Sequence, residues 1–342
     1  MPERARVRLG SGNGGCMKKV ILTAGVVAVA AVGCGIAYLA LATPKMRAAP
    51  DIKVAMTPER IERGRYLFEH VAHCDGCHSP RDWTKLRAPT IQQTRGSGFE
   101  FPSELGFPGR VVSANLTPDP ETGLGRWTDG EKMRAIREGV SRDGRALFPL
   151  MPYQEYARMS DEDLESLVAF LNTLKPVRSQ NAKTDLDFPA NLMVRFTPRP
   201  IEGRIANPDR SDRVKYGRYL VALGECAGCH TPSERGENIA GKEFAGGEEF
   251  RIAGFLVRSA NITPDEETGI GKWPEERFVS TFKGHAELTA ESAPKATQAS
   301  FTLMPWMDLS KLEDDDLKSI YAFLRTLKPI YNSVEKHPPV AN

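Results

Sequence analysis

This sequence has a small net charge, no run of basic residues and few cysteines outside two short motifs. The 342 residues carry 46 Lys and Arg against 44 Asp and Glu, which leaves a formal net charge of +2. Because the charge is small and there is neither a basic tract nor an aromatic stacking repeat, no nucleic-acid partner is expected. Of six cysteines, four lie in two short motifs, and only Cys16 and Cys34 remain, near the N-terminus. A disulfide framework is therefore not expected in the body of the protein.

What the sequence does contain is the motif C-x-x-C-H, present as CDGCH at residues 74–78 and as CAGCH at residues 226–230. This spacing is typical of covalent c-type haem attachment, in which two thiols add to the porphyrin vinyl groups and the adjacent imidazole binds the iron. The sequence thus predicts two covalently bound haem c groups. The predicted attachment residues are Cys74, Cys77, Cys226 and Cys229, and the predicted proximal iron ligands are His78 and His230.

Two other uses of a C-x-x-C pair are disfavoured. A zinc site would need the two pairs to share one metal, whereas each pair has its own histidine and its own copy of the surrounding sequence. A thioredoxin-like redox motif would need a βαβ pattern, and none is found around either pair.

Both motifs belong to a passage that the chain repeats in the same order. The first copy contains RGRYL, CDGCH, SANLTPDPETGLGRW, FPLMPY and DLESLVAFLNTLKPV, and the second contains YGRYL, CAGCH, SANITPDEETGIGKW, FTLMPW and DLKSIYAFLRTLKPI. Met151 follows Cys74 by 77 residues, and Met304 follows Cys226 by 78. Such matched spacing indicates a duplicated haem domain. The expected copies are residues 57–178 and 210–331, joined by a proline-punctuated linker at 179–209.

Helical patterns dominate each copy. Thr57-Pro58-Glu59 is typical of a helix start, and so is Ser160 followed by Asp161-Glu162-Asp163. Gly64 and Gly217 hold the same place in the two copies and are expected to allow close helix crossing. No stretch alternates convincingly as a paired strand would. The predicted fold class is all-α, with helices joined by long loops.

Matched residues outside the C-x-x-C-H motifs complete the predicted haem sites. Met151 and Met304 stand in Leu-Met-Pro-aromatic before the last helix of each copy. They are the predicted sixth iron ligands, since a thioether raises the potential relative to a second imidazole; otherwise each fills the core. Trp127 and Trp273 are expected to pack against the porphyrin and to offer an indole N–H to a propionate. The remaining candidates are Asn115 and Asn261, expected to fix their loops, His285, an alternative to Met304, and His70 and His73, expected at the surface.

An uncharged, mostly apolar run covers residues 20–42 and follows two lysines. It approaches the ~20 residues that span a bilayer and exceeds the apolar core of a cleaved secretory signal. The sequence predicts a cytoplasmic leader at 1–19, a transmembrane anchor at 20–42 in the inner (cytoplasmic) membrane, and haem domains that face the periplasm. The alternatives that stay open are cleavage near Ala42, lipidation at Cys34, and a true start at Met17, which leaves residues 1–16 untranslated.

These motifs resemble those of the cytochrome c subunits of membrane-bound bacterial alcohol and gluconate dehydrogenases. The likeness lies in C-x-x-C-H, in the N-[LI]-T-P-D…T-G-[LI]-G-x-W loop and in Met-Pro-Tyr, over residues 57–178 and 210–331. It implies tandem class I cytochrome c domains, axial Met151 and Met304, and a relay of electrons towards a quinone or a terminal oxidase. The chain departs from those subunits in having two haem motifs where three are common, and in its N-terminal apolar run.

We therefore expect a membrane-anchored periplasmic dihaem cytochrome c, which is an electron-transfer protein rather than an enzyme. Its partners would be redox proteins, namely a dehydrogenase subunit, a quinol-oxidising complex or an oxidase. Two alternatives stay open. A haem enzyme of the peroxidase or thiosulfate dehydrogenase type needs an open iron position, against which the two methionine loops argue. A dihaem subunit of a terminal oxidase also has an N-terminal span.

Overall fold

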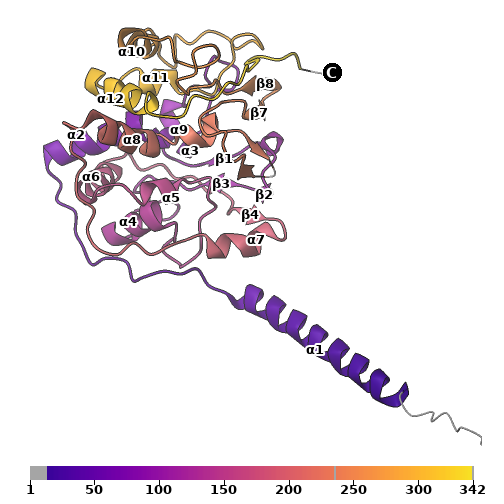
Figure 1. Cartoon of the computed structure of the whole chain (residues 1–342). Coiled ribbons are helices and arrows are strands. Elements are labelled where there is room, and N and C mark those ends of the chain that lie inside the picture. Colours follow the sequence, from indigo (N-terminus) through magenta and orange to yellow (C-terminus); the bar gives the residue numbers. More distant parts are fainter. Residues whose placement is uncertain (1–13, 235, 341–342) are drawn as a thin grey trace, which may run out of the picture. The chain divides into compact units, whose positions relative to one another are not determined.

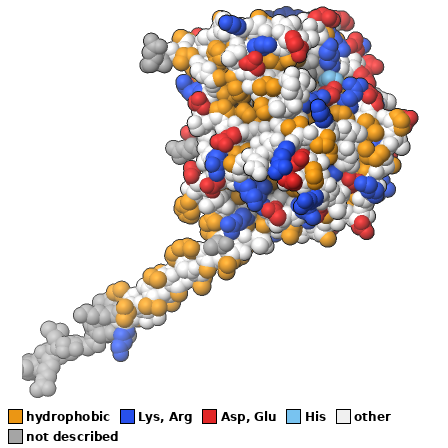
Figure 2. Space-filling view, turned by 180° about the vertical axis from the view of Figure 1, so that it is seen from behind, with side chains coloured by type: hydrophobic (Ala, Val, Ile, Leu, Met, Phe, Trp, Pro, Cys, Tyr) orange, Lys and Arg blue, Asp and Glu red, His pale blue; other side chains and the backbone are white. Residues whose placement is uncertain are grey.

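The computed structural model describes residues 14–234 and 236–340, which fall into two units divided between Thr43 and Pro44. The first unit holds one described helix, α1 (Gly14–Leu41), with apolar side chains along its length (Figure 1, Figure 2). Its segment Lys19–Leu39 has a mean hydropathy of 2.4 and is not buried. Among the described residues this is the one helix long and apolar enough to cross a membrane, a property that anchors share with secretory signals. Residues 1–13 of the predicted leader lie outside the described residues.

The second unit contains two halves with the same order of helices (Figure 1). The first half contains α2 (Pro58–Tyr66), the π-helical turn η1 (Leu67–Val71), α3 (Cys74–His78), α4 (Asp129–Glu138), α5 (Tyr153–Tyr156) and α6 (Asp161–Leu171). The second half contains α8 (Arg213–Leu223), α9 (Cys226–His230), α10 (Glu275–Lys283), α11 (Trp306–Leu309) and α12 (Asp314–Leu324). The short helical elements outside these sets are η2 (Gln92–Thr94), η3 (Ser103–Leu105), α7 (Ala190–Met193) and η4 (Val194–Phe196).

Each half is built on a close crossing between its first and last long helices. α2 packs against α6, and α8 packs against α12. A Cβ on Gly64 would lie 2.5 Å from the carbonyl carbon of Ser166, and a Cβ on Gly217 would lie 2.5 Å from that of Ser319. Only glycine fits so close to a neighbouring helix, because carbon atoms in contact stand about 3.5–4.0 Å apart. The expected role of Gly64 and Gly217 is confirmed.

The predicted helix starts are also confirmed. Thr57 accepts a hydrogen bond from Arg60 N (3.3 Å) at the start of α2, and Ser160 accepts one from Asp163 N (3.1 Å) at the start of α6. Each bond satisfies a backbone N–H that has no partner within the helix. A reciprocal capping box at Thr128 opens α4, and this cap was not predicted.

Four two-stranded antiparallel ladders interrupt the predicted all-α fold. The pairs are β1 (Phe99–Glu100) with β3 (Val112–Ser113), β2 (Gly109–Arg110) with β4 (Asp185–Leu186), β5 (Ser233–Glu234) with β6 (Glu237–Asn238), and β7 (Glu249–Ile252) with β8 (Phe255–Arg258). The expectation that no stretch pairs as a strand was therefore wrong. Even β7 and β8 are too short to show a period of two. Their turn residues, Ala253 (φ 52°) and Gly254 (φ 81°), replace the Asn-Gly or Asp-Gly that marks such a turn in a sequence.

Two segments outside the helices of the two halves are hydrogen-bonded to the first half. The chain before α2 lies against α4, where Val54 N donates to Asp129 Oδ2 (3.0 Å). The segment predicted as a linker returns to the first half twice. Its strand β4 pairs with β2, and Ile205 O accepts a bond from Asp161 N (2.9 Å). The segment 179–209 is thus hydrogen-bonded to the first half at two places.

The two halves share one apolar core and hold each other through a reciprocal pair of tyrosines. Tyr219 of α8 donates to Asp163 Oδ2 (2.6 Å) and accepts a bond from the N-cap N–H of α6 (3.2 Å). Tyr66 of α2 donates to Asp316 Oδ2 (2.8 Å) and accepts one from the N-cap N–H of α12 (2.9 Å). Each half thus caps the last helix of the other half.

Candidate haem-binding sites

The two C-x-x-C-H motifs form the short helices α3 and α9, which have the same setting in both halves. Each follows a residue in the left-handed region, His73 (φ 32°) or Glu225 (φ 52°), where the chain turns from the preceding helix. In each motif the second cysteine, Cys77 or Cys229, is exposed, and the first, Cys74 or Cys226, is half-buried against the core. The exposed thiol of each motif is open to addition to a porphyrin vinyl group.

The histidine of each motif is oriented by one backbone carbonyl. Nδ1 of His78 lies 2.8 Å from Ala114 O, and Nδ1 of His230 lies 2.7 Å from Ala260 O. Because a carbonyl oxygen only accepts, Nδ1 carries the proton and Nε2 keeps the lone pair that a metal ligand needs. Burial lowers the pKa of both imidazoles, although the bond to the carbonyl acts in the opposite direction. Both rings therefore favour the neutral form, which is the form that binds iron.

The half-buried thiol of each motif is not activated for disulfide exchange. Burial raises the pKa of the half-buried Cys74 and Cys226, to about 12 for Cys226, so these two thiols stay protonated at neutral pH. The thiolate is the form that binds zinc and attacks disulfides. Within the described part of the chain, no three His, Cys, Asp or Glu side chains gather closely enough to hold a metal ion between them.

The N-[LI]-T-P-D loops are matching hydrogen-bonding units. Asn115 accepts bonds from Thr117 N (2.9 Å) and Thr117 Oγ1 (2.7 Å) and donates to Val177 O (2.8 Å). Asn261 makes the same three bonds with the matching residues of the second half, at 2.9, 2.7 and 2.8 Å. Both asparagines are buried, and each ties its loop to the chain just beyond the last helix of its half. Their expected loop-fixing role is confirmed.

The same loops contain a second set of side-chain hydrogen bonds, which was not predicted from the sequence. Asp119 accepts bonds from the N–H and the hydroxyl of Thr122, both at 2.7 Å, and Asp265 accepts the same pair from Thr268, also at 2.7 Å. These bonds lower the pKa of both carboxyls. The signal was the Asp-x-x-Thr spacing that both copies share, which is the pattern of a side-chain turn.

The predicted methionine ligands lie in equivalent turns. The carbonyl of Met151 accepts a bond from the N–H two residues later, and the carbonyl of Met304 does the same, both at 2.8 Å. Each turn therefore leads directly into α5 or α11. The half-buried side chains that pack against the common core include Cys74, Trp127 and Met151 in the first half, and Cys226, Trp273 and Met304 in the second. In both halves the chain thus supplies the donor types that hold the iron of haem c, an imidazole and a thioether, and the thioether lies against the apolar core.

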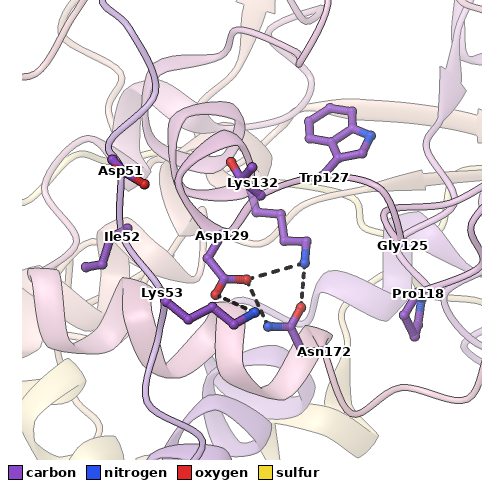
Figure 3. A pocket seen from close by; sticks show the side chains of 10 residues that line it. Asp51, Ile52, Lys53, Pro118, Gly125, Trp127, Asp129, Lys132 and Asn172 are labelled. Atoms are coloured by element: carbon purple, nitrogen blue, oxygen red, sulfur yellow. Dashed lines mark hydrogen bonds and ion pairs between the residues drawn. The ribbon is translucent and has the colours of Figure 1, made fainter.

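The two predicted tryptophans differ in their surroundings. Trp127 borders a cavity of about 420 Å³ that Lys132 and Asn172 also line, and Lys132 Nζ lies 3.6 Å from Asp129 there (Figure 3). The ring of Trp273 is instead covered by the guanidinium of Arg277, at 4.3 Å from the ring centroid. The bond from each indole N–H to a propionate stays a prediction.

The histidines considered as other candidates lie at the boundary between the halves. Nδ1 of His285 is 2.8 Å from Nη2 of Arg87 in the first half, so this ring is already engaged by a cation. His70 and His73 were expected at the surface, and both are half-buried instead. The reason is that each faces backbone of the second half. A contact between the halves cannot be seen in either copy of the repeat alone.

The helices α3 and α9, which hold the two C-x-x-C-H motifs, are neighbours across the same boundary (Figure 1). Cys77 lies close enough to Cys229 to contribute to the raised pKa of that thiol, after desolvation and Glu225. Tyr156 of α5 is buried near the first motif and Glu225, since burial and then Cys74, Cys77 and Glu225 raise its pKa well above the usual value. No sequence pattern marked Tyr156 or Glu225, because their surroundings come from both copies.

Comparison with known proteins agrees with this geometry. Residues 214–328 match the family model described as cytochrome c. The chain is 30% identical over 286 residues to the cytochrome c subunit of a quinone alcohol dehydrogenase from Gluconobacter oxydans, a match that covers 79% of this chain and 55% of the relative. It is 40% identical over 278 residues to a nicotinate dehydrogenase subunit from Pseudomonas putida, covering 78% of this chain and 21% of that protein.

A third relative has nearly the same length as this chain. It is a diheme cytochrome c-type protein from Cereibacter sphaeroides, 28% identical over 320 residues, with 90% of this chain and 98% of the relative covered. The chain spans only 55 to 60% of the length of the alcohol dehydrogenase subunits it matches. These matches confirm the resemblance inferred from the motifs.

Proposed function

Because residues 214–328 belong to the cytochrome c family, we propose that the chain is a dihaem cytochrome c that transfers electrons through one haem c in each half. The observation that carries the proposal is the matched setting of His78 and His230, whose Nδ1 atoms lie 2.8 and 2.7 Å from backbone carbonyls. Each stands beside the same asparagine-fixed loop. The match supports a second haem in the first half, outside the residues that the family model covers.

Each haem would be held by two cysteines, a histidine and a methionine. The proposed sets are Cys74, Cys77, His78 and Met151, and Cys226, Cys229, His230 and Met304. Bound iron supplies a one-electron step between its ferric and ferrous states, and a thioether ligand raises the potential of that step. Two protein ligands on each iron leave no position for a substrate, which suits electron transfer rather than catalysis. Trp127 and Trp273 would pack against the two porphyrins.

Electrons would pass from haem to haem across the boundary between the halves. The helices α3 and α9 adjoin there, with Tyr156 buried near the first motif and Glu225. Electron tunnelling falls steeply with distance, so the boundary must hold that distance constant. The bonds of Tyr66 and Tyr219 to the opposite half, at 2.8 and 2.6 Å, supply such a constraint.

The proposed electron donor is a dehydrogenase, and the acceptor is a quinone pool or an oxidase of the same membrane. The relatives are named as cytochrome subunits of alcohol, fructose and gluconate dehydrogenases. In this proposal α1 remains as an anchor in the inner membrane, and both haem-binding halves face the periplasm. Its apolar segment Lys19–Leu39 supports this placement.

Haem content is the first test. The full chain, produced in a host that attaches c-type haem, should carry two covalently bound haems by intact-mass measurement. Replacing Cys74 and Cys77 together by serine should remove one haem, and replacing Cys226 and Cys229 together should remove the other. Cys34→Ser is the matched control and should keep both. Fewer than two covalent haems in the wild-type protein would overturn the proposal.

Carbon monoxide binding separates electron transfer from catalysis. The ferrous wild-type protein should bind carbon monoxide at neither haem, because a methionine fills each sixth position. Met151→Ala and Met304→Ala should each open one haem to the gas. Met307→Ala, which changes a half-buried methionine without a counterpart in the first copy, should open none. Rapid binding by the wild-type protein would favour the haem-enzyme alternative.

A further inference from the structure

Two large apolar side chains project into solvent from the segment that joins the halves. Phe188 is 79% exposed just before α7, and Met193 is 65% exposed at the last residue of α7. They stand five positions apart. Single exposed apolar residues are ordinary on soluble proteins, whereas a cluster of them marks a surface that contacts a partner or a membrane.

The chain enters the first half on a turn next to this segment. Met46, itself half in solvent, lies against the turn that follows α4, where its Cε would be 3.4 Å from a Cβ on Gly144. Arg47 pairs with Glu138, the last residue of α4, at 2.6 Å. Residues 44–47 are thus held on the first half at the C-terminal end of α4.

The same turn adjoins the segment that carries Phe188 and Met193. A Cβ on Gly139, the residue that ends α4, would lie 2.6 Å from the ring of Tyr153. Burial raises the pKa of Tyr153, and Thr197, next to its hydroxyl, acts in the opposite direction. Thr197 directly follows η4, which continues from α7. Figure 1 shows α7 and the start of the second unit at the end of the first half that lies away from α10 and α12.

A short connection joins this end of the first half to α1. The apolar segment Lys19–Leu39 covers about 32 Å as a helix, which is enough to cross a hydrocarbon layer of about 30 Å. Five residues then lead from Leu41 to Met46, and an extended chain covers at most about 18 Å over that length. An α1 that crosses the bilayer therefore keeps the turn beneath Met46 close to the lipid headgroups.

The charge of this end suits an anionic surface. The segments 44–47, 141–146 and 187–199 hold six basic residues and two acidic ones, Asp143 and Asp187. Two of the basic residues are paired outside these segments, Arg47 with Glu138 and Arg142 with Glu131 (3.4 Å). Positive charge remains in excess after those pairs. Basic residues beside exposed apolar ones are the combination that binds a membrane containing anionic lipid.

We propose that this end of the first half lies on the membrane, with Phe188 and Met193 inserted among the lipid headgroups and the neighbouring basic residues against anionic lipid. The inference rests on the proposed anchoring by α1. Two attachments, one covalent and one by surface contact, would hold the haem domains in a fixed orientation towards electron-transfer partners in the same bilayer. The boundary between the halves, where α3 and α9 adjoin, would face away from the lipid.

Spin labels on the haem-loaded full chain test the contact. The protein is placed in vesicles of phosphatidylethanolamine and phosphatidylglycerol, and one nitroxide is attached at a time in a Cys16→Ser background. The label at Phe188→Cys should collide more with oxygen, which concentrates in lipid, than with a water-soluble nickel complex. Tyr331→Cys is the matched control, because Tyr331 is an apolar residue of the second half that is 63% exposed, and its label should favour the nickel complex. Both variants also carry Cys34→Ser, and Met193→Cys repeats the test at a second position.

A label on the native Cys34 separates this proposal from the anchor on which it rests. Cys34 lies within α1, so its label should report lipid if the helix spans the bilayer. If the Cys34 label reported lipid while the labels at 188 and 193 reported water, as the one at 331 does, the surface contact would be wrong and the anchor would stand. A Cys34 label in water would overturn the anchor itself. Exchanging phosphatidylglycerol for phosphatidylcholine should move the 188 label towards water, and an unchanged signal would refute the part assigned to anionic lipid.

Discussion

Replacing Gly64 by alanine is expected to loosen the first half, and replacing Gly217 is expected to loosen the second. Both glycines lie in the first helix of their half, where it crosses the last helix. A new Cβ at Gly64 would stand 2.5 Å from the carbonyl carbon of Ser166 and 2.8 Å from Phe170 Cβ. The change adds one methyl group and removes no hydrogen bond.

Two effects of opposite sign decide the size of the change. Alanine is favoured over glycine within a helix by about 1 kcal/mol. Against this, carbon atoms in contact need about 3.5 Å, so α2 would have to retreat by about 1 Å from the backbone of α6. Overpacking a core costs about 1–3 kcal/mol, and a clash with backbone falls at the upper end because backbone cannot change rotamer. We expect a net fall of about 2 kcal/mol in the free energy of unfolding.

Guanidinium denaturation of the haem-loaded protein measures this difference. Far-ultraviolet circular dichroism reports the helices, and haem absorbance reports the iron ligands. Glu62→Ala is the matched control, because it places alanine on the exposed face of the same helix and should change stability by no more than about 0.5 kcal/mol. If Gly64→Ala were as stable as the wild-type protein, the clash would cost no more than the gain in helix propensity, and the inferred closeness of the crossing would be wrong.

Three further changes have expected outcomes. Burial and a neighbouring carboxylate raise the pKa of Glu225 from 4.5 to about 7; the folded state then loses about 3 kcal/mol as the pH rises through this range. Glu225→Gln should therefore raise the melting temperature at pH 8 but not at pH 4, and the exposed Glu234→Gln should do neither. Tyr66→Phe and Tyr219→Phe should each lower the free energy of unfolding in urea by about 2 kcal/mol, and equal stability to the wild type would refute the reciprocal contact. Thr128→Ala should cost about 1 kcal/mol in the same assay, and no loss would contradict the capping box.

Features contained within one copy of the repeat were predictable, because the sequence presents each of them twice. Gly64 and Gly217 share one position before the haem motif, and both prove to lie at a helix crossing. Asn115 and Asn261 share one loop, and both make the same bonds. The start of α6 at Ser160 follows a local rule that needs no tertiary information. A local pattern repeated at matched spacing distinguishes a structural requirement from coincidence.

Contacts between the copies could not be predicted in this way. Tyr66 and Tyr219 belong to the repeat, yet nothing local says that each bonds to the opposite half. Arg87 and His285 occur in one copy each, in loops where the two copies differ, so no second instance draws attention to them. Periodicity and capping rules describe residues that are close in sequence, whereas the partners in these contacts are separated by 56 to 250 positions and meet only after both halves have folded.

The two copies of the repeat differ in sequence at the boundary between the halves, so the two proposed haem sites have unequal surroundings. The residue before the first motif cysteine is His73 in one half and Glu225 in the other, and both take the same left-handed conformation. Arg63 pairs with Asp163 at 2.7 Å, whereas the residue that matches Arg63 in the second copy is the uncharged Tyr216. Charge and burial around a haem set its potential even when the ligands are the same. We therefore expect two resolved midpoints in a redox titration, which give an electron a preferred direction across the boundary; a single shared midpoint would contradict this argument.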